Sequence, residues 1–484
     1  MSEKQSATAL VAATAERLRD DFIKVSDEIW GHAELRFVEH RSAAAQIAVL
    51  EKHGFTIRRQ VAGIETAFIA EKGEAGPVIA FLGEFDALSA MSQEAGSLEQ
   101  KAISPGATGH GCGHNLLGAG SMLAATTLAE VAKETGHPVR VRYYGCPGEE
   151  GGSGKAFMAR DGLFDDVDVA FTWHPAPITA ARSNENLAVI GVYYKFTGRA
   201  AHASHSAHLG RSALDGMALL HIGTNFLREH VGPDVRMHYA VTNGGGTSPN
   251  VVQAEAETLY YVRARDLTEV LEVAERLHEV ARGAAQMTGT EVEITVERGS
   301  SNLIPNPVME TVLHNKLMEL GPIPFDEADQ NYARELQKTF PPNAIDACLK
   351  LYHFTDDAVH NRVDRETPLH TGVRRYEGAP HFRAGSTDVG DVSWVTPTAQ
   401  CWTSTWALGT PGHSWQVVAQ GKTPAAHKAM VHAAKTLAAG AAELLLNPSQ
   451  MEAAKAEWRR RRGDKPYISP IPDGVKPQPP HEVA

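Results

Sequence analysis

The chain has 484 residues, of which 43% are hydrophobic, and this size predicts an extensive core divided between two domains. Its formal net charge of -12 argues against nucleic acid or an anionic membrane as the main partner. The N-terminal segment lacks the apolar core of a signal peptide, and no stretch of roughly 18 apolar residues indicates a membrane span. The four cysteines form no dense disulfide pattern, so we expect a cytoplasmic protein in a reducing compartment.

The first 187 residues alternate helical and strand-like patterns. Two amphipathic helices are predicted first, over residues 14–30 and 41–53. Three apolar strands and one apolar helix follow, with the strands at residues 77–82, 139–144 and 167–172 and the helix at residues 116–131. This alternation is typical of an α/β domain, in which helices cover a central sheet.

Polar side chains with metal-binding or acid–base chemistry follow the ends of these strands. They are Glu84 and Asp86 after the first strand, Glu149 and Glu150 after the second, and His174 after the third, while Cys112 and His114 lie in a glycine-rich loop before the apolar helix. Because α/β enzymes place chemistry beyond the carboxyl ends of strands, we expect these four segments to converge at one edge of the sheet.

Thiolate, imidazole and carboxylate groups are the ligands that divalent transition metals prefer. An adjacent carboxylate that stays off the metal can take a proton from metal-bound water. Taken singly, a Cys-x-His pair is more often structural, and a Glu-Glu pair is usually solvated surface. Taken together, Cys112, His114, Glu149, Glu150 and His174 predict a metal-dependent hydrolase.

A different order of elements occupies residues 188–299. It runs strand, helix, strand, strand, helix, strand, at residues 188–196, 211–229, 235–241, 256–265, 267–287 and 291–296. This order is that of a split ferredoxin-like α+β module. A further ligand candidate, His413, lies well beyond it, so the first domain must resume afterwards. We therefore predict a catalytic domain formed by residues 1–187 and 300–484, with a lid domain inserted at residues 188–299.

Residues 325–380 are polar, rich in Asp, His and Arg, and are predicted to be irregular. In one interpretation they shape the substrate pocket, and in the other they form a long solvated surface excursion. The proline-rich segment 465–484 is expected to be extended.

Four motifs carry a resemblance to a known family: GEFDAL from Gly83, GHGCGHNLLG from Gly109, GCPGEEGG from Gly145 and GTPGHSW from Gly409. Jointly they resemble the metal-dependent amidohydrolases that include aminoacylases, carboxypeptidase G, hippurate hydrolase and plant auxin-conjugate hydrolases. The resemblance covers nearly the whole chain. It implies an α/β metallopeptidase catalytic domain with a central mixed sheet flanked by helices, and an inserted ferredoxin-like domain that serves as lid or dimerisation unit.

The same resemblance implies an activity. The expected reaction is cleavage of the amide bond between an aromatic acyl group and an amino acid, such as p-aminobenzoyl-glutamate or a similar N-acyl amino acid. A dipeptidase, an aminoacylase or another aromatic-amide hydrolase of the family is the alternative. A third hypothesis is a subunit that needs a homologous partner chain for activity.

The resemblance also implies roles for residues of the catalytic domain. It implies that one or two divalent ions are bound by Cys112, His114, Glu150, His174 and His413. Glu149 matches the general base that deprotonates the attacking water and passes the proton to the departing amine. Asp86 matches the acidic residue that orients a ligand histidine from behind. Manganese is our first expectation and zinc the second, because the thiolate favours zinc whereas the resemblance favours manganese.

Further roles fall to residues expected around the substrate. His202 matches a lid histidine that reaches the active site of the partner subunit and binds the carbonyl oxygen, although a plain surface histidine is the alternative. Asn250 matches a lid asparagine that touches substrate. Arg263 either holds the substrate carboxylate through a bidentate pair or is a strand-surface charge. Ser386 lies in a segment that resembles the loop facing the acidic part of the substrate.

Two residues depart from the family pattern. Glu84 stands where many relatives have a metal-ligating histidine, and Asn115 stands where auxin-conjugate hydrolases usually have aspartate. The number of bound ions, one or two, is therefore left open. The expected partners are a small N-acyl amino acid and a second subunit, either in a homodimer or in a hetero-oligomer with a homologous chain, with no nucleic acid and no membrane.

Overall fold

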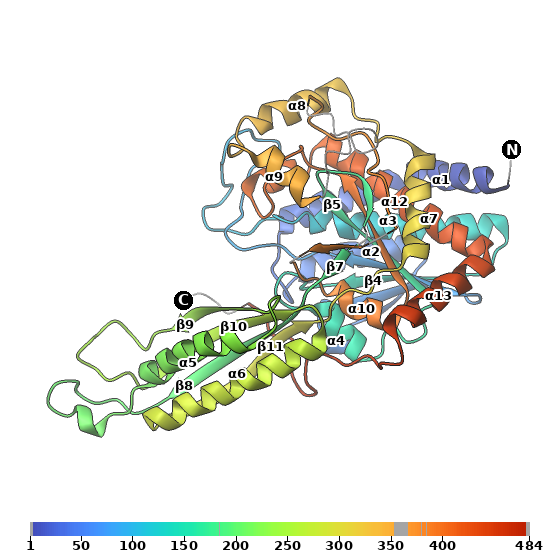
Figure 1. Ribbon diagram of the computed structural model, residues 1–484. Coiled ribbons are helices and arrows are strands. Elements are labelled where there is room, and N and C mark those ends of the chain that lie inside the picture. The colour runs from blue at the N-terminus through green and yellow to red at the C-terminus, as the bar shows by residue number, and fades with distance from the viewer. Residues whose placement is uncertain (1–2, 183, 353–365, 379, 384, 481–484) are drawn as a thin grey trace.

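The computed structural model describes residues 3–182, 184–352, 366–378, 380–383 and 385–480. Figure 1 shows a larger part built on a seven-stranded sheet and an elongated part built on a four-stranded sheet that extends away from it. A small third sheet pairs β7 (Asn184–Asn186) in parallel with β12 (His381–Arg383). The two main parts correspond to the mixed sheet and the ferredoxin-like insertion expected from the sequence.

The seven-stranded sheet is mixed. Its strands lie in the order β1 (Thr56–Arg59), β2 (Phe68–Lys72), β4 (Arg140–Cys146), β3 (Val78–Glu84), β5 (Val169–Ala176), β13 (Thr398–Ser404) and β6 (Ala180–Arg182). The four central strands β4, β3, β5 and β13 run parallel, whereas β2 and β6 pair antiparallel at their flanks. Every residue of β3 is buried, which is typical of a parallel strand covered on both faces of the sheet.

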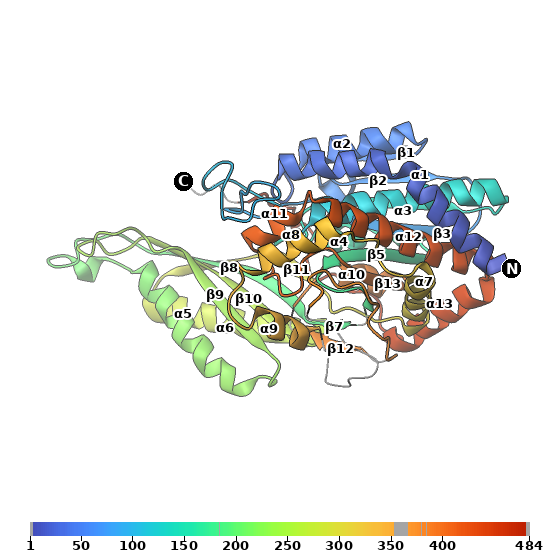
Figure 2. The same cartoon turned by 90° about the horizontal axis from the view of Figure 1, so that it is seen from above.

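Helices cover both faces of this sheet (Figures 1 and 2). One face carries α1 (Glu3–His32), α2 (His40–Lys52), α3 (His114–Thr135), α7 (Pro307–Leu320) and α12 (Pro424–Leu446), and α13 (Pro448–Arg462) packs outside α7 and α12. The other face carries α4 (Gly154–Arg160) and α10 (Val389–Val395). Helix α12 is apolar enough by composition to span a membrane, but 78% of its most apolar window is buried, as in a core helix.

Helix α3 packs unusually close to the strands that carry the site, because it has glycine where it meets them. A Cβ at Gly118 would lie 2.7 Å from the carbonyl oxygen of Glu84, and one at Gly120 would lie 2.8 Å from the indole nitrogen of Trp173. The helix ends at Gly136, whose φ of 71° is the left-handed conformation that favours glycine at a helix end. This contact holds the start of α3 against the ends of β3 and β5.

The four-stranded unit follows the predicted order of elements. It consists of β8 (Ala188–Thr197), α5 (Ala213–Leu227), β9 (Arg236–Asn243), β10 (Glu255–Ala264), α6 (Leu267–Thr288) and β11 (Glu291–Ser300). The strands lie antiparallel in the order β11-β8-β10-β9. Both helices pack on one face of the sheet around a separate core, and neither of them covers the other face (Figures 1 and 2).

The expectation that residues 325–380 are irregular was wrong for part of this stretch. Within the described residues it contains α8 (Glu327–Gln337) and α9 (Ala344–Leu351). Helix α8 begins with a reciprocal capping box between Asp326 and Asp329, a start signal that stabilises a short helix. Residues 353–365 and 379 lie outside the described part of the chain. The segment after α13 is extended through residue 480, and its Ile471 is buried against the α4 side of the sheet.

Candidate active site

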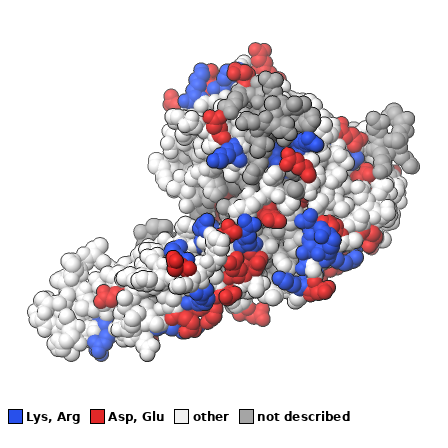
Figure 3. All heavy atoms as spheres, viewed as in Figure 1, with Lys and Arg blue, Asp and Glu red and all other residues white. Residues whose placement is uncertain are grey.

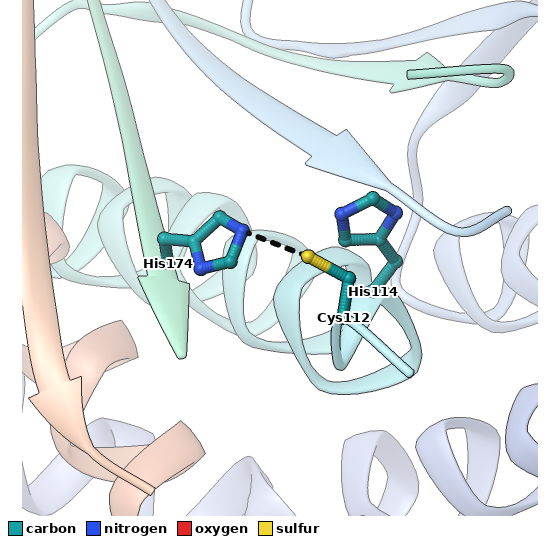
Figure 4. A group of neighbouring side chains, drawn as sticks. All are labelled: Cys112, His114 and His174. Carbon is teal, nitrogen blue, oxygen red and sulfur yellow. Dashed lines mark hydrogen bonds between the residues drawn. The ribbon is translucent and has the colours of Figure 1, made fainter. Parts of the chain in front are cut away.

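The ends of β3, β4 and β5 meet the start of α3 at one edge of the large sheet. Figure 4 shows Cys112, His114 and His174 pointing toward one another there, with 3.5 Å between the Cys112 Sγ and the His174 Nε2. His114 is the first residue of α3, and Gly113 before it has a φ of 78°. A Cβ at Gly113 would lie 2.7 Å from the Trp406 ring, so this sharp entry into the helix requires glycine.

Two boundaries differ from the sequence-based expectation. Glu84 is the last residue of β3 and His174 lies within β5, whereas both were expected in loops after shorter strands. The strands continue because a parallel neighbour pairs with each residue, Cys146 with Glu84 and Trp402 with His174. Apolar content alone underestimates the length of such strands, since backbone pairing extends into the polar residues.

Ligand-type atoms gather in three overlapping sets. Within each set the atoms lie within 4.8 Å of one another, and the sets are Cys112, His114 and His174; Cys112, Glu150 and His413; and Glu84, His114 and Glu149. The Nε2 of His114 is buried and makes no hydrogen bond with a described residue. Such an orphaned nitrogen beside a thiolate and two carboxylates suits a divalent transition metal ion, so the residues fit the expected metal.

Asp86 fixes two members of this cluster. One of its oxygens lies 2.9 Å from the Nδ1 of His114, and the other accepts the backbone N–H of Glu150 at 2.8 Å. Because Asp86 holds the Nδ1, the Nε2 of His114 is left facing the other ligand-type atoms, where Glu84 lies 3.2 Å away.

The two neighbouring glutamates, Glu149 and Glu150, have pKa values shifted in opposite directions. Burial, together with the charges of Glu84 and Glu150, raises the pKa of Glu149 well above its usual value. Burial also acts to raise the pKa of Glu150, but the hydrogen bond from His413, at 3.1 Å, and the charge of His114 bring it down to about 2. Glu150 is therefore the stronger anion of the pair, and Glu149 the better proton acceptor.

Cys112 and His413 belong to the same charged network. Burial and the charge of Glu150 raise the pKa of Cys112, but His174 and His114 outweigh them and bring it to about 6. A thiolate at neutral pH is the form that binds a metal ion. His413 has a φ of 50°, a left-handed conformation that is uncommon for residues other than glycine and that recurs at functional sites.

A buried lysine beside the cluster was not predicted from the sequence. The ammonium nitrogen of Lys155, at the start of α4, lies 2.7 Å from Glu84 Oε1 and 2.6 Å from Asp388 Oδ1, and all three side chains are buried. Lys155 thereby holds Glu84 beside His114. Little in the sequence points to it, because Lys155 follows the GCPGEEGG motif by three positions and a lysine in a glycine-rich segment has the pattern of a solvated cation.

The cluster forms one wall of a cavity of about 780 Å³. Its lining includes the site candidates Cys112, Glu149, Glu150, His174, His413 and Ser386, and the aromatic side chains of Tyr352, Trp402 and Trp406. Residues 341–344 and several side chains of α9 also line it, so the described part of the 325–380 stretch shapes the cavity. The Oγ of Ser386 is buried and makes no hydrogen bond with a described residue.

The three candidates from the four-stranded unit do not line this cavity. His202 and Asn250 lie beside each other in loops beyond β8 and β9, where the backbone N–H of Ala203 donates to the Asn250 carbonyl at 2.9 Å. The His202 ring stacks on His205 with 3.7 Å between ring centres. Arg263 lies in β10, also outside the cavity. Within one chain, the structure brings together the catalytic-domain candidates but not these three.

Several relatives match almost the full length of the chain. The chain is 44% identical over 464 residues to a subunit of the p-aminobenzoyl-glutamate hydrolase of Escherichia coli (strain K12), with 95% of this chain and 96% of the relative covered. It is 28% identical over 471 residues to the Xaa-Arg dipeptidase of Mus musculus, with 94% and 92% covered.

The fold also has solved counterparts. A Bacillus subtilis protein described as a dinuclear metal binding peptidase superposes with a TM-score of 0.53 at 17% identity, covering 89% of this chain and 99% of that one. A family model described as Peptidase family M20/M25/M40 matches residues 80–453. The chain therefore belongs to peptidase family M20/M25/M40 and is a metal-dependent hydrolase.

Proposed function

We propose that this protein hydrolyses the amide bond between an aromatic acyl group and an amino acid, with p-aminobenzoyl-glutamate as its substrate. One observation carries this proposal: ligand-type side chains surround Glu149 at the wall of a cavity that Trp402, Trp406 and Tyr352 also line. Aromatic side chains stack favourably on an aromatic acyl group. The name of the relative that is 44% identical supports the same substrate.

The proposed metal ligands are Cys112, His114, Glu150, His174 and His413, which hold one or two manganese or zinc ions. Such an ion, when bound, lowers the pKa of water and polarises a carbonyl group. The thiolate suits zinc and the carboxylates suit manganese. Asp86 supports this assembly because it holds both the His114 ring and the backbone of Glu150.

Glu149 is the proposed general base. It lies beside Glu150 on the loop after β4 and lines the cavity, where it takes a proton from the attacking water. The same carboxyl group then donates that proton to the departing amine nitrogen. Ser386 lines the cavity, its hydroxyl makes no hydrogen bond within the described part of the chain, and it is the proposed contact for the polar part of the substrate.

His202 and Asn250 are proposed to act in the active site of a second subunit, where His202 donates a hydrogen bond to the carbonyl oxygen of the substrate. Their position outside the cavity of their own chain supports this role. The same unit exposes apolar side chains on α5 and on the edge strand β9, namely Ile222, Phe226, Tyr239 and Val241. In Figure 3 its distal end carries few charged side chains.

Exposed apolar side chains beside an open strand edge are typical of a surface that another subunit covers. We propose a dimer formed through this surface, either of two identical chains or with a homologous chain. The name of the Escherichia coli relative supports the second arrangement, because it describes one subunit of an enzyme whose other named subunit also matches this chain.

A hydrolysis screen of the purified, metal-loaded protein tests the proposal, with the protein alone and together with any co-encoded homologue. The substrates are p-aminobenzoyl-glutamate, other N-acyl amino acids and dipeptides that end in arginine. We expect turnover of the aromatic N-acyl amino acids to exceed that of the dipeptides. Turnover confined to dipeptides would replace this proposal with a dipeptidase activity.

A further inference from the structure

Two arginines share one aromatic ring on the face of the four-stranded sheet opposite α5 and α6. The guanidinium carbon of Arg263 lies 5.5 Å from the centre of the Tyr261 ring, and that of Arg298 lies 5.7 Å from the same centre. Arg263 and Tyr261 are two positions apart in β10, so their side chains point to the same face. Both arginine side chains are held over the ring at the sheet surface.

Arg298 reaches the ring from two strands away because of two local features. Gly191 of β8 pairs with both Tyr261 and Arg298, and a Cβ at Gly191 would lie 2.9 Å from the Arg298 stem and 2.9 Å from the Tyr261 ring. The register of β11 shifts between Val296 and Arg298, with Glu297 as the extra residue. A bulge of this kind re-aims the side chains that follow it.

These two cations are not neutralised by the described residues. Neither Arg263 nor Arg298 forms a salt bridge or hydrogen bond there, and the Nε of each is buried without a partner. The nearest acid in sequence, Glu297, is taken by Arg36, with 2.7 Å between Nη2 and Oε1. Burial, together with the charge of Arg298, lowers the pKa of Arg263. Two adjacent, partly buried cations without an acid are stabilised when they bind an anion.

The pair lies next to the catalytic loop. A Cβ placed on Gly151 would lie 3.8 Å from the Nη1 of Arg298. Gly151 directly follows Glu149 and Glu150, which line the cavity. Arg298 therefore lies beside the loop that carries Glu149, although neither arginine lines the cavity itself.

We propose that Arg298 binds the second carboxylate of an acidic amino acid beside Arg263, and that Arg298 thereby makes the enzyme select a dicarboxylic amino acid such as glutamate over a neutral one. This inference rests on the proposed amidohydrolase function. Each guanidinium offers a fork of N–H donors that matches one carboxylate. The shared Tyr261 ring keeps the two forks close enough for one short dicarboxylate.

The test measures kcat/KM for p-aminobenzoyl-glutamate and for p-aminobenzoyl-glutamine in the wild type and in Arg298→Met. The glutamine substrate keeps the shape and the α-carboxylate but lacks the second carboxylate. We expect Arg298→Met to lower kcat/KM for the glutamate substrate by roughly 10- to 100-fold, mainly through KM, because a charged hydrogen-bonded pair is lost. The glutamine substrate should change less than threefold.

Two further variants serve as a control and as a conservative replacement of Arg298. Lys195 is a cation on the same face of the sheet, farther along β8, and its side chain is 42% exposed. Lys195→Met should leave kcat/KM unchanged for both substrates. Arg298→Lys keeps the positive charge but loses the forked pair of N–H donors, so kcat/KM for the glutamate substrate should fall by an intermediate amount. This variant provides the test if Arg298→Met fails to fold. An equal loss on both substrates, or no loss on either, would overturn the assignment of Arg298.

A binding measurement separates this inference from the proposed function. Metal-loaded Glu149→Ala protein is titrated calorimetrically with glutarate and with butyrate, which requires no turnover. We expect glutarate to bind more tightly than butyrate, and Arg263→Met and Arg298→Met each to abolish the difference. If the wild type hydrolyses no N-acyl amino acid but this preference is present, the proposed function fails and the dicarboxylate site stands. If hydrolysis occurs without the preference, the inference fails alone.

Discussion

Arg36 and Glu297 form a buried ion pair, 2.7 Å between Nη2 and Oε1, that joins the catalytic part of the chain to the four-stranded unit. Their side chains are 14% and 4% exposed. Arg36 also donates a hydrogen bond to the carbonyl of Gly151, and it packs so closely that a Cβ at Gly151 would lie 2.8 Å from its Nη1. One side chain therefore connects strand β11 to the loop that carries Glu149.

Replacing Arg36 by methionine should lower both stability and activity. The change leaves Glu297 buried without a counter-charge, a cost on the order of 3 kcal/mol, and it frees the loop beside Glu149. We expect a lower Tm and a kcat reduced by roughly tenfold or more. The double variant Arg36→Met with Glu297→Met removes both charges and should recover Tm but not kcat. Recovery of both would show that the pair only stabilises the fold.

Lys155 should be essential for the integrity of the site. Its removal by Lys155→Met leaves Glu84 and Asp388 as unpaired buried carboxylates, and we expect a loss of about 3 to 5 kcal/mol. Thermal unfolding and metal content of the purified variant measure the effect. Adding Asp388→Asn to this variant should restore part of the stability, because one of the two unpaired charges is then removed. A single variant as stable as the wild type would contradict this role.

Asp391 should make stability depend on pH. Burial raises its pKa to about 7 from an ordinary value of 3.8, despite hydrogen bonds from Ser301 and Tyr467. The folded state then binds more protons than the unfolded state between these values, so this group costs stability as pH rises through the window, by about 1.4 kcal/mol per pH unit. Above about pH 7 the cost is constant.

The comparison of Tm between wild type and Asp391→Asn, from pH 5 to pH 8, measures this effect. Asparagine does not titrate, so the variant should gain on the wild type as pH rises to about 7, after which the difference should be constant. Parallel Tm profiles throughout would mean that Asp391 is not protonated in the folded protein.

His202 should act across the subunit interface. His202→Ala should be nearly inactive, and so should Glu149→Ala, but a mixture of the two that exchanges subunits should recover activity. Each mixed dimer contains one active site with both residues intact. His205→Ala, which removes the ring stacked on His202, serves as the neighbouring control. A mixture without activity would favour action of His202 within one chain.

Several features of the site could be predicted from the sequence because they depend on where a residue stands relative to the nearest strand or helix in the chain. Glu149, Glu150 and Cys112 follow strands or precede a helix, and parallel strands bring such positions to one edge. The four-stranded unit could be predicted because its strands alternate and its helices are amphipathic, with capping side chains at Ser212 and Asp266.

Other features depend on contacts between distant residues and could not be predicted. Arg36 and Glu297 are 261 positions apart, and the bulge that aims Glu297 interrupts the alternation of β11. Lys155 in a glycine-rich loop has the pattern of a solvated cation, and only the packing of α4 against α10 buries it with Asp388. Long-range ion pairs of this kind leave no periodic trace in the sequence.

The most direct test of the proposed mechanism is the rate of p-aminobenzoyl-glutamate hydrolysis after chelation and after reloading with manganese or zinc, measured in the wild type and in Glu149→Ala. We expect the chelated wild type to lose activity and to regain it with metal. The Glu149→Ala protein should bind the same amount of metal and remain inactive, because the proton acceptor is missing. Turnover by metal-loaded Glu149→Ala at the wild-type rate, or by the fully chelated wild type, would contradict this account.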